Sequence, residues 1–159
     1  MPKKSAGILL YRRCAGGSQW EVLLVHPGGP FWRKKDQGAW TVPKGEFDDR
    51  ELPLAAARRE FKEELGADAP GGDPIKLKPV KQAGGKVVHC WAIEGDFDPE
   101  LLQSNTFEQE WPPKSGRLVK FPEVDRAAWF SPEAAKQKIL GGQVPLIDEL
   151  VEVLLDRNK

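Results

Sequence analysis

Several residue types that mark particular classes of protein are scarce in this chain. Its 159 residues include two cysteines, one tyrosine and one methionine. Two cysteines cannot build the disulfide framework of a small secreted domain, and they do not have the spacing of a structural zinc site. No apolar run approaches the roughly 18 residues that a membrane-spanning helix needs. The apolar run at 6–11 is too short for a secretory signal, so the sequence predicts a cytoplasmic protein with no membrane segment.

The chain also lacks an excess of charge of either sign, since 24 lysines and arginines balance 24 aspartates and glutamates. A net charge of zero argues against a general affinity for nucleic acids or membranes. The balance is nevertheless uneven along the chain. Residues 1–44, the basic front, hold eight basic and two acidic side chains, whereas residues 45–73, the acidic block, hold nine acidic and four basic ones. The sequence therefore places two regions of opposite charge next to each other.

Length and patterning predict one α/β domain, because 159 residues with 40% hydrophobic and 30% charged side chains fit a single globular core. Strands are expected at 5–12, 20–26, 40–42, 75–82, 86–94 and 127–130, with a turn at 16–18 joining the first two. Helices are expected at 53–65, about 131–140 and about 144–157. Residues from about 96 to 116 have no clear periodicity and are expected to form a long loop, of a kind that is often functional.

The acidic block has a pattern of its own. Glu60, Glu63 and Glu64 are spaced i, i+3 and i+4 on the expected helix, so their carboxylates share one face. Like charges so placed destabilise a helix by about 0.2–0.5 kcal/mol per pair. A divalent cation such as Mg²⁺ or Mn²⁺, which prefers oxygen ligands, would relieve that repulsion. The alternative is an ordinary acidic surface helix, whose charges are offset by Arg58, Arg59 and Lys62.

The residues around these glutamates carry a longer motif. Residues 45–67 begin with Gly45, have Glu51 after five residues, and after seven more continue as Arg-Glu-Phe-Lys-Glu-Glu-Leu-Gly-Ala. This order matches the Nudix box, G-x5-E-x7-R-E-U-x-E-E-x-G-U, with U a bulky apolar residue; only Ala67 is smaller than usual. The chain therefore resembles the Nudix hydrolases. The order of strands and helices outside the box also resembles the fold of that family, a single-domain α/β/α sandwich with a mixed sheet.

The resemblance implies roles for the residues of the box. Glu60 and Glu64 would be the main ligands of Mg²⁺ or Mn²⁺, with Glu63 helping directly or through water, and the Gly45 carbonyl often joins them. Glu51 and Arg59 would form the ion pair that orients the loop and the helix. The residue types agree with this pair, because a half-buried arginine needs an acidic partner and suits a bidentate one. The candidate catalytic residues are therefore Glu51, Arg59, Glu63 and Glu64.

The resemblance also implies a reaction, in which water attacks a phosphorus atom of a nucleoside diphosphate linked to another group X. Metal ions would bridge the phosphate oxygens, neutralise charge and lower the pKa of a bound water. Glu64 is the usual proton acceptor within the box. In other members the base lies on a late loop, and Glu108 and Glu110 in the expected loop are candidates for that role. They are equally well read as ordinary solvated acids of a loop.

Substrate-binding candidates lie before the box. The stretch at 40–45, Trp-Thr-Val-Pro-Lys-Gly, resembles a W-x-x-P-K-G stretch of Nudix members that act on dinucleoside polyphosphates and diphosphoinositol polyphosphates, so Lys44 would neutralise a phosphate oxygen. Upstream, Arg33-Lys34-Lys35 with His26 forms a positive patch suited to a polyphosphate. The equal alternative is a solvated loop tip, with His26 a polar residue at a strand end. Trp32 is a candidate for stacking on a nucleobase, and Glu110 for contact with the substrate.

The sequence thus predicts a metal-dependent pyrophosphohydrolase acting on a nucleoside or dinucleoside polyphosphate. The alternative is a nucleotide-binding or regulatory domain that keeps the fold and has lost catalysis, against which the intact box argues. The tyrosine that follows the box in asymmetric dinucleoside tetraphosphate hydrolases has no counterpart, since the only tyrosine is Tyr11. Removal of RNA caps would need a large basic groove, yet residues 74–159 hold 12 basic and 13 acidic side chains, so a nucleic-acid partner is not expected.

Overall fold

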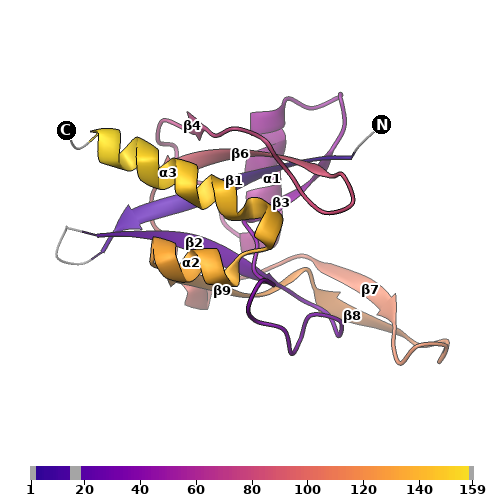
Figure 1. Cartoon of the computed structure of the whole chain (residues 1–159). Helices are drawn as coiled ribbons and strands as arrows, with labels where there is room; N and C mark the ends of the chain where they lie inside the picture. The colour runs from indigo at the N-terminus through magenta and orange to yellow at the C-terminus, as the bar shows by residue number, and fades with distance from the viewer. Residues whose placement is uncertain (1–2, 15–18, 158–159) are drawn as a thin grey trace.

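A mixed sheet runs through the middle of the molecule (Figure 1). The computed structural model describes residues 3–14 and 19–157. The strands follow the order β4-β6-β1-β2-β9, with β3 beside β1 and β5 beside β6. β1 and β6 run parallel, and the other neighbours in this sheet are antiparallel. The bounds are β1 Lys4–Arg13, β2 Trp20–Pro27, β3 Lys44–Phe47, β4 Ile75–Lys76, β5 Val80–Lys81, β6 Val87–Glu94 and β9 Val124–Phe130.

Helices cover both faces of the sheet, which confirms the predicted sandwich. α1 Pro53–Leu65 lies behind the sheet in Figure 1, whereas α2 Pro132–Lys138 and α3 Val144–Arg157 lie in front of it. The side chains of β1 alternate between the two cores: Ile8 and Leu10 pack on the α1 side, and Leu9 packs on the α2 and α3 side. Within the described residues, no helix combines the length and the apolar content that crossing a bilayer requires.

Local sequence explains why α1 begins and ends where it does. Pro53 occupies the first turn, where its missing N–H is not needed, and a run of alanines and other strong helix formers follows. Gly66 ends the helix with a left-handed backbone at φ 83°, and its N–H donates to the Lys62 carbonyl. The buried face of the helix contains Glu60 and Glu64 besides apolar residues. The helix therefore carries two carboxylates toward the body of the protein.

The first half of the chain agrees with the predicted strands at most positions. β1 and β2 form the expected antiparallel pair, and the expected turn at 16–18 lies outside the described residues. The expected strand at 75–82 is present as two short pieces, β4 and β5, each antiparallel to β6. The expected strand at 40–42 is wrong. Thr41 pairs with Val25 of β2 while Trp40 pairs with Ile139 after α2, so the segment changes partner from one residue to the next and no ladder forms.

The long loop expected at about 96–116 is also wrong. This stretch contains a 3-10 turn, η1 Pro99–Leu101, and a strand, β7 Thr106–Glu110, that pairs antiparallel with β8 Leu118–Pro122. The β7–β8 hairpin extends from the body of the protein at the lower right of Figure 1. Most of its side chains are exposed, so it lacks the alternation of apolar residues by which a half-buried strand is predicted.

The end of the chain differs from the prediction only in its boundaries. β9 begins at Val124, three residues before the expected strand, and α2 ends at Lys138. Ser131 caps α2 by accepting a hydrogen bond from the Ala134 N–H. A second 3-10 turn, η2 Gly141–Gln143, leads into α3, whose bounds are those expected.

Candidate active site

The three glutamates of α1 lie at different depths. Glu60 and Glu64, one turn apart, are each only 8% exposed, whereas Glu63 is half-buried. Carboxylates are rarely buried to this extent unless a positive group or a ligand compensates them. The question for this site is therefore what balances Glu60 and Glu64.

A backbone segment presses directly against Glu60. A Cβ atom added to Gly45 would lie only 2.0 Å from the carboxylate of Glu60, so only glycine fits there. Gly45 belongs to β3, which pairs with β1 and is held there in register opposite Ala6. The glycine at the start of the box thus has a steric reason, because it lets the main chain approach a carboxylate on the helix.

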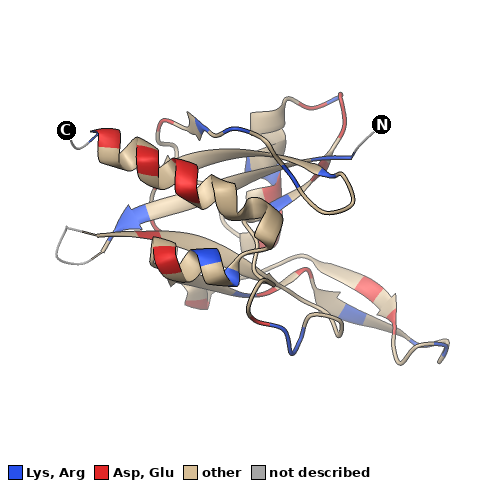
Figure 2. Cartoon of the chain, in the orientation of Figure 1, with Lys and Arg blue, Asp and Glu red and all other residues tan. Residues whose placement is uncertain are grey.

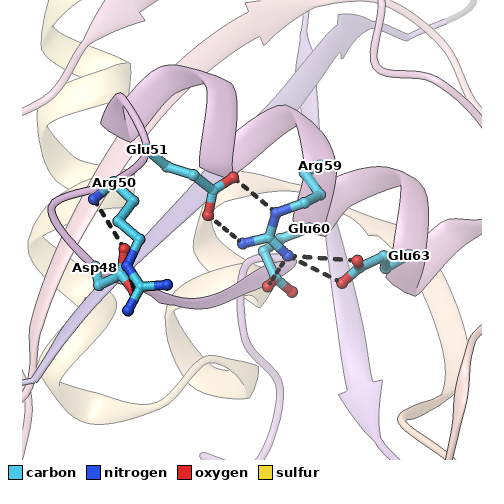
Figure 3. A network of polar contacts seen from close by, with 6 residues as sticks. All are labelled: Asp48, Arg50, Glu51, Arg59, Glu60 and Glu63. Atoms are coloured by element: carbon cyan, nitrogen blue, oxygen red, sulfur yellow. Dashed lines mark hydrogen bonds and ion pairs between the residues drawn. The ribbon is translucent and has the colours of Figure 1, made fainter.

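Arg59 gathers the acidic side chains around itself (Figure 3). Its Nε and Nη2 atoms donate to the two carboxylate oxygens of Glu51, at 2.8 and 2.7 Å. Its Nη1 atom donates to Glu60 at 2.8 Å and lies 3.3 Å from a carboxylate oxygen of Glu63. These bonds raise the pKa of Arg59, and they lower that of Glu51. The Glu51–Arg59 pair is bidentate and ties the loop before α1 to the helix.

The two buried carboxylates remain short of positive charge in spite of Arg59. Burial raises the pKa of Glu64 well above its usual range, the charge of Glu60 adds to the rise, and Lys44 opposes it. Burial also raises the pKa of Glu60, where Arg59 acts in the opposite direction. The amine of Lys44 is itself partly buried, which lowers its pKa. A cation at this position would therefore be favourable.

The chemistry of these donors fits a hard divalent cation, although their present arrangement does not enclose one. In the described part of the chain, no three His, Cys, Asp or Glu side chains stand in a metal-binding arrangement. Arg59 accounts for this, since it holds Glu60 and Glu63 toward its guanidinium. The pressed Gly45 backbone and the carboxylates with raised pKa nevertheless provide oxygen donors with excess negative charge, which is the environment that Mg²⁺ and Mn²⁺ prefer.

The structure adds a fourth carboxylate that the sequence did not indicate. Glu123 lies between β8 and β9, and its charge contributes to the raised pKa of both Glu60 and Glu64. Burial, and then the charge of Glu63, raise the pKa of Glu123 itself. Glu60, Glu63, Glu64 and Glu123 are called the acid cluster below. No local pattern marks Glu123, because it reaches the helix only through long-range folding.

Backbone hydrogen bonds hold Glu123 in this position. The carbonyl of Glu63 lies in the last turn of α1, where no N–H of the helix remains to bond it, and it accepts from the Asn105 N–H at 2.8 Å. The Asn105 carbonyl in turn accepts from the Glu123 N–H at 2.8 Å. The Glu123 carbonyl accepts from the Gly28 N–H at 2.9 Å. This relay connects the end of α1 to Glu123 and then to the segment that follows β2.

The candidate loop glutamates lie elsewhere. Glu108 and Glu110 are exposed residues of β7, and Glu108 pairs across the hairpin with Lys120. A carboxylate oxygen of Glu110 accepts from the Lys114 N–H at 2.6 Å and so closes the hairpin turn. The prediction that this region forms a loop that could deliver a base was therefore wrong in its premise, and Glu123 is the late glutamate that the structure brings to α1.

The predicted positive patch is exposed, except for its histidine. Arg33, Lys34 and Lys35 belong to residues 28–38, called the basic loop below. They form the blue part of this loop, between β2 and β3, in Figure 2. None of the three forms an ion pair with an acid in the described part of the chain. Lys35 places its Nζ atom 3.5 Å from the ring centroid of Phe31, and the ring of Trp32 meets that of Phe31 edge-on. His26 is fully buried, so it is not part of a charged surface.

Only part of the basic front reaches the acidic block. Lys3 pairs with Glu46 at 3.6 Å, Lys4 pairs with Asp49, and Lys44 lies close to the acid cluster. Arg12, in contrast, is bonded to Glu21 and to Asp96 outside the block. The two charged regions of the sequence thus meet at β3 and the start of β1, and not along their whole length.

Comparison with known proteins gives consistent matches over the whole fold. A family model described as the NUDIX domain matches residues 1–150. An RNA pyrophosphohydrolase of Erythrobacter litoralis is 30% identical over 146 residues, which cover 82% of this chain and 76% of that protein. A binary complex of a C. elegans Ap4A hydrolase has a TM-score of 0.67 at 23% identity, over 96% of this chain and 98% of that one. The NUDIX domain of Shewanella oneidensis NrtR complexed with ADP ribose has a TM-score of 0.66 at 19% identity, over 97% and 89%.

Proposed function

Since the chain belongs to the Nudix family and is a hydrolase that acts on pyrophosphate bonds, we propose that it cleaves the polyphosphate chain of a nucleotide with the help of Mg²⁺ or Mn²⁺. The observation that carries the proposal is the acid cluster, in which two buried glutamates have a raised pKa and a third, Glu123, joins them from a distant part of the chain. A surface helix with a merely acidic face would not bury carboxylates next to one another.

The residues that would hold the metal come from α1, from β3 and from the connection between β8 and β9. Glu60, Glu63 and Glu64 of α1 are the proposed ligands, with the Gly45 carbonyl and Glu123 as further oxygen donors. When bound, the metal would neutralise charge on the phosphate oxygens and lower the pKa of a coordinated water. Glu51 acts through Arg59, whose position it fixes, and the guanidinium of Arg59 contacts Glu60 and Glu63. These two residues therefore position the ligands.

Glu64 is the proposed proton acceptor. A base works best when its pKa approaches the working pH, and burial moves the pKa of Glu64 in that direction. Glu123 is the alternative base, because its pKa is also raised and because its position on a connection between strands differs from that of the helix residues. It replaces Glu108 and Glu110 as the late glutamate in this scheme.

Lys44 is the proposed contact to a phosphate oxygen. It lies close enough to Glu60 and Glu64 for their charges to oppose the loss of its proton, and burial strengthens any charge pair that it makes. The structural similarity to an Ap4A hydrolase and the stretch at 40–45 favour a dinucleoside polyphosphate as the substrate. Arg33 and Lys35 of the basic loop would bind phosphates farther from the metal, and Trp32 would stack on a base.

A second candidate substrate is the 5′ end of an RNA. The relative with 30% identity over 146 residues is described as an RNA pyrophosphohydrolase. The basic loop offers what an RNA end would need next to a hydrolytic centre, since it presents exposed cations beside the aromatic rings of Phe31 and Trp32. The chemistry would be the same, because a 5′-triphosphate end contains the same pyrophosphate bonds.

A hydrolysis screen separates these possibilities. Dinucleoside polyphosphates, nucleoside triphosphates, ADP-ribose, diphosphoinositol polyphosphates and a 5′-triphosphorylated RNA are incubated with Mg²⁺, Mn²⁺ or a chelator, and ¹⁸O-labelled water locates the attacked phosphorus. Metal-dependent turnover of a dinucleoside polyphosphate supports the first proposal, and selective turnover of the RNA supports the second. Tight nucleotide binding without any metal-dependent turnover would contradict both and indicate a binding or regulatory domain.

A further inference from the structure

His26 is a buried histidine whose two ring nitrogens are both engaged. The side chain is 0% exposed at the end of β2. Its Nδ1 atom lies 2.7 Å from a carboxylate oxygen of Asp125, and its Nε2 atom lies 2.6 Å from the carbonyl oxygen of Lys35. A carbonyl oxygen only accepts hydrogen bonds, so the Nε2 atom donates to Lys35, while the Nδ1 atom faces the carboxylate of Asp125. One side chain thus connects β2, β9 and the basic loop.

The bond to Lys35 is the main hold on the tip of the basic loop. Within the described part of the chain, no other hydrogen bond ties residues 30–35 to the sheet; the Lys35 N–H bonds the Trp32 carbonyl inside the loop. The Gly28 bond to Glu123 holds one end of the loop. The other end is held by the bond from the Gly38 N–H to the Gln137 carbonyl and by the Asp36 carboxylate, which accepts from the Trp40 Nε1–H at 2.7 Å and from Lys138. His26 therefore provides the hydrogen bond from the sheet to the tip itself, between these two anchored ends.

The position of Asp125 relates this hold to the candidate active site. Asp125 follows Glu123 by two residues, and the loop leaves β2 at Gly28, which bonds the Glu123 carbonyl. Gly29 also packs closely on Phe107 of the hairpin, where a Cβ atom would approach the ring to 2.9 Å. The loop that carries Trp32, Arg33 and Lys35 thus begins at a residue bonded to Glu123, on the connection between β8 and β9.

We propose that His26 and Asp125 are positioning residues, which hold the Lys35 carbonyl so that the cations of the basic loop meet the polyphosphate of a substrate bound at the acid cluster. This inference rests on the function proposed above. His26 and Asp125 would affect substrate affinity through the main-chain carbonyl of Lys35, and neither side chain would contact the substrate. The ring of Trp40, which meets the His26 ring edge-on at 5.2 Å, and Arg126, which lies over Trp40, complete the packing around the pair.

Two isosteric substitutions separate the two bonds of the histidine. In His26→Gln the amide nitrogen replaces the ring Nε2 atom, so the bond to the Lys35 carbonyl is retained and that to Asp125 is lost. In His26→Asn the amide nitrogen replaces the ring Nδ1 atom, so the bond to Lys35 is lost. Loss of one hydrogen bond predicts a KM about three- to tenfold higher for His26→Asn with kcat within about twofold, and a smaller increase for His26→Gln. His89→Asn, at the other histidine of the chain, is the matched control and should keep the wild-type KM.

Hydrogen exchange tests the same inference without relying on turnover. In His26→Asn the amides of residues 28–38 should exchange faster than in the wild type, while those of α1 keep their protection, and His26→Gln should stay close to the wild type. A wild-type KM and wild-type loop exchange in His26→Asn would overturn the proposal, as would a fall in kcat with unchanged KM.

If His26→Asn does not fold, Asp125→Ala and Asp125→Asn take its place. Asp125→Ala should raise KM. Asp125→Asn, which keeps a hydrogen-bond acceptor for His26, should not. Equal KM values in the two variants would overturn the proposal. If the wild type hydrolyses no nucleotide, the proposed function fails. The exchange comparison then still shows whether His26 holds the loop through the Lys35 carbonyl.

Discussion

The acid cluster and the basic loop carry opposite charges and differ in burial, since the acid cluster contains buried side chains and the cations of the basic loop are exposed. Glu60 and Glu64 are buried side by side, and their burial raises the pKa of each. Arg33, Lys34 and Lys35 are exposed and have no acidic partner in the described part of the chain. Buried carboxylates need a compensating cation in the resting protein, whereas exposed cations cost the fold little and need no partner until a substrate arrives.

The two regions also differ in how they are built. Three of the four carboxylates of the acid cluster come from one helix, whose geometry fixes their spacing. The basic loop has no regular secondary structure of its own and is held by separate contacts, to Glu123, to Gln137, to His26 and, through Asp36, to Trp40 and Lys138. Substitutions in the acid cluster should therefore change the chemical step, and substitutions in the basic loop should change affinity.

The largest effect is expected for Glu64→Gln, which removes the proposed base while keeping the shape of the side chain. Loss of general-base catalysis predicts a kcat lower by about 10²–10⁴-fold. Initial rates under saturating substrate and metal measure it. Glu110→Gln is the matched control, because Glu110 lies on the exposed hairpin and its carboxylate bonds the Lys114 main chain. Similar losses in both variants would mean that Glu64 has no special role.

Gly45→Ala should have the next largest effect. Its new methyl group would overlap with the Glu60 carboxylate, which must then move away from the main chain. A displaced ligand predicts a metal requirement about 10- to 100-fold higher, seen in the concentration of Mg²⁺ that gives half-maximal rate. Gly141→Ala serves as the control, since nothing lies within 4 Å of its Cβ position. An unchanged metal requirement in Gly45→Ala would separate Glu60 from the metal.

A smaller and different effect is expected in the basic loop. The double substitution Arg33→Ala with Lys35→Ala should raise KM about tenfold and leave kcat nearly unchanged, and added salt should reduce the difference from the wild type. Lys78→Ala removes a comparable exposed lysine. The Lys78 N–H bonds Glu149 of α3, on the face of the sheet opposite α1, so this variant should keep the wild-type KM. A fall in kcat without a rise in KM would contradict the proposal that the basic loop contributes to affinity and the acid cluster to the chemical step.

The smallest effect concerns stability in the absence of metal. Because the folded-state pKa of Glu60 and of Glu64 is raised, the folded protein keeps these protons to a higher pH than the unfolded chain does. Stability with a chelator should therefore fall as the pH rises above the usual range of glutamate, near about pH 4.3. Glu64→Gln should lose part of this dependence, so that its melting temperature exceeds that of the wild type near neutral pH. An identical pH profile in both proteins would show that Glu64 is not strained by its burial.

Local features of the site could be predicted from the sequence, and long-range ones could not. The spacing of Glu60, Glu63 and Glu64 on α1 follows from helix geometry, and the Glu51–Arg59 pair joins residues close in sequence. Glu123 reaches the helix through hydrogen bonds that connect three distant segments, and no spacing along the chain encodes that relay.

The same reason explains two of the errors in secondary structure. The β7–β8 hairpin is mostly exposed, so its strands have no apolar periodicity to read. The segment at Trp40 and Thr41 has apolar residues, but its hydrogen-bond partners are split between β2 and the end of α2. In both places the pairing partner decides the structure, and the partner lies far away in the sequence.

Binding of Mn²⁺, followed by electron paramagnetic resonance, tests the central claim most directly. The wild type and a variant with both Glu60→Gln and Glu64→Gln are titrated in the absence of substrate, with circular dichroism to establish that the variant is folded. The wild type is expected to take up Mn²⁺, and the folded variant is not. Equal uptake by the two proteins would contradict the claim that the buried carboxylates of α1 form the metal site.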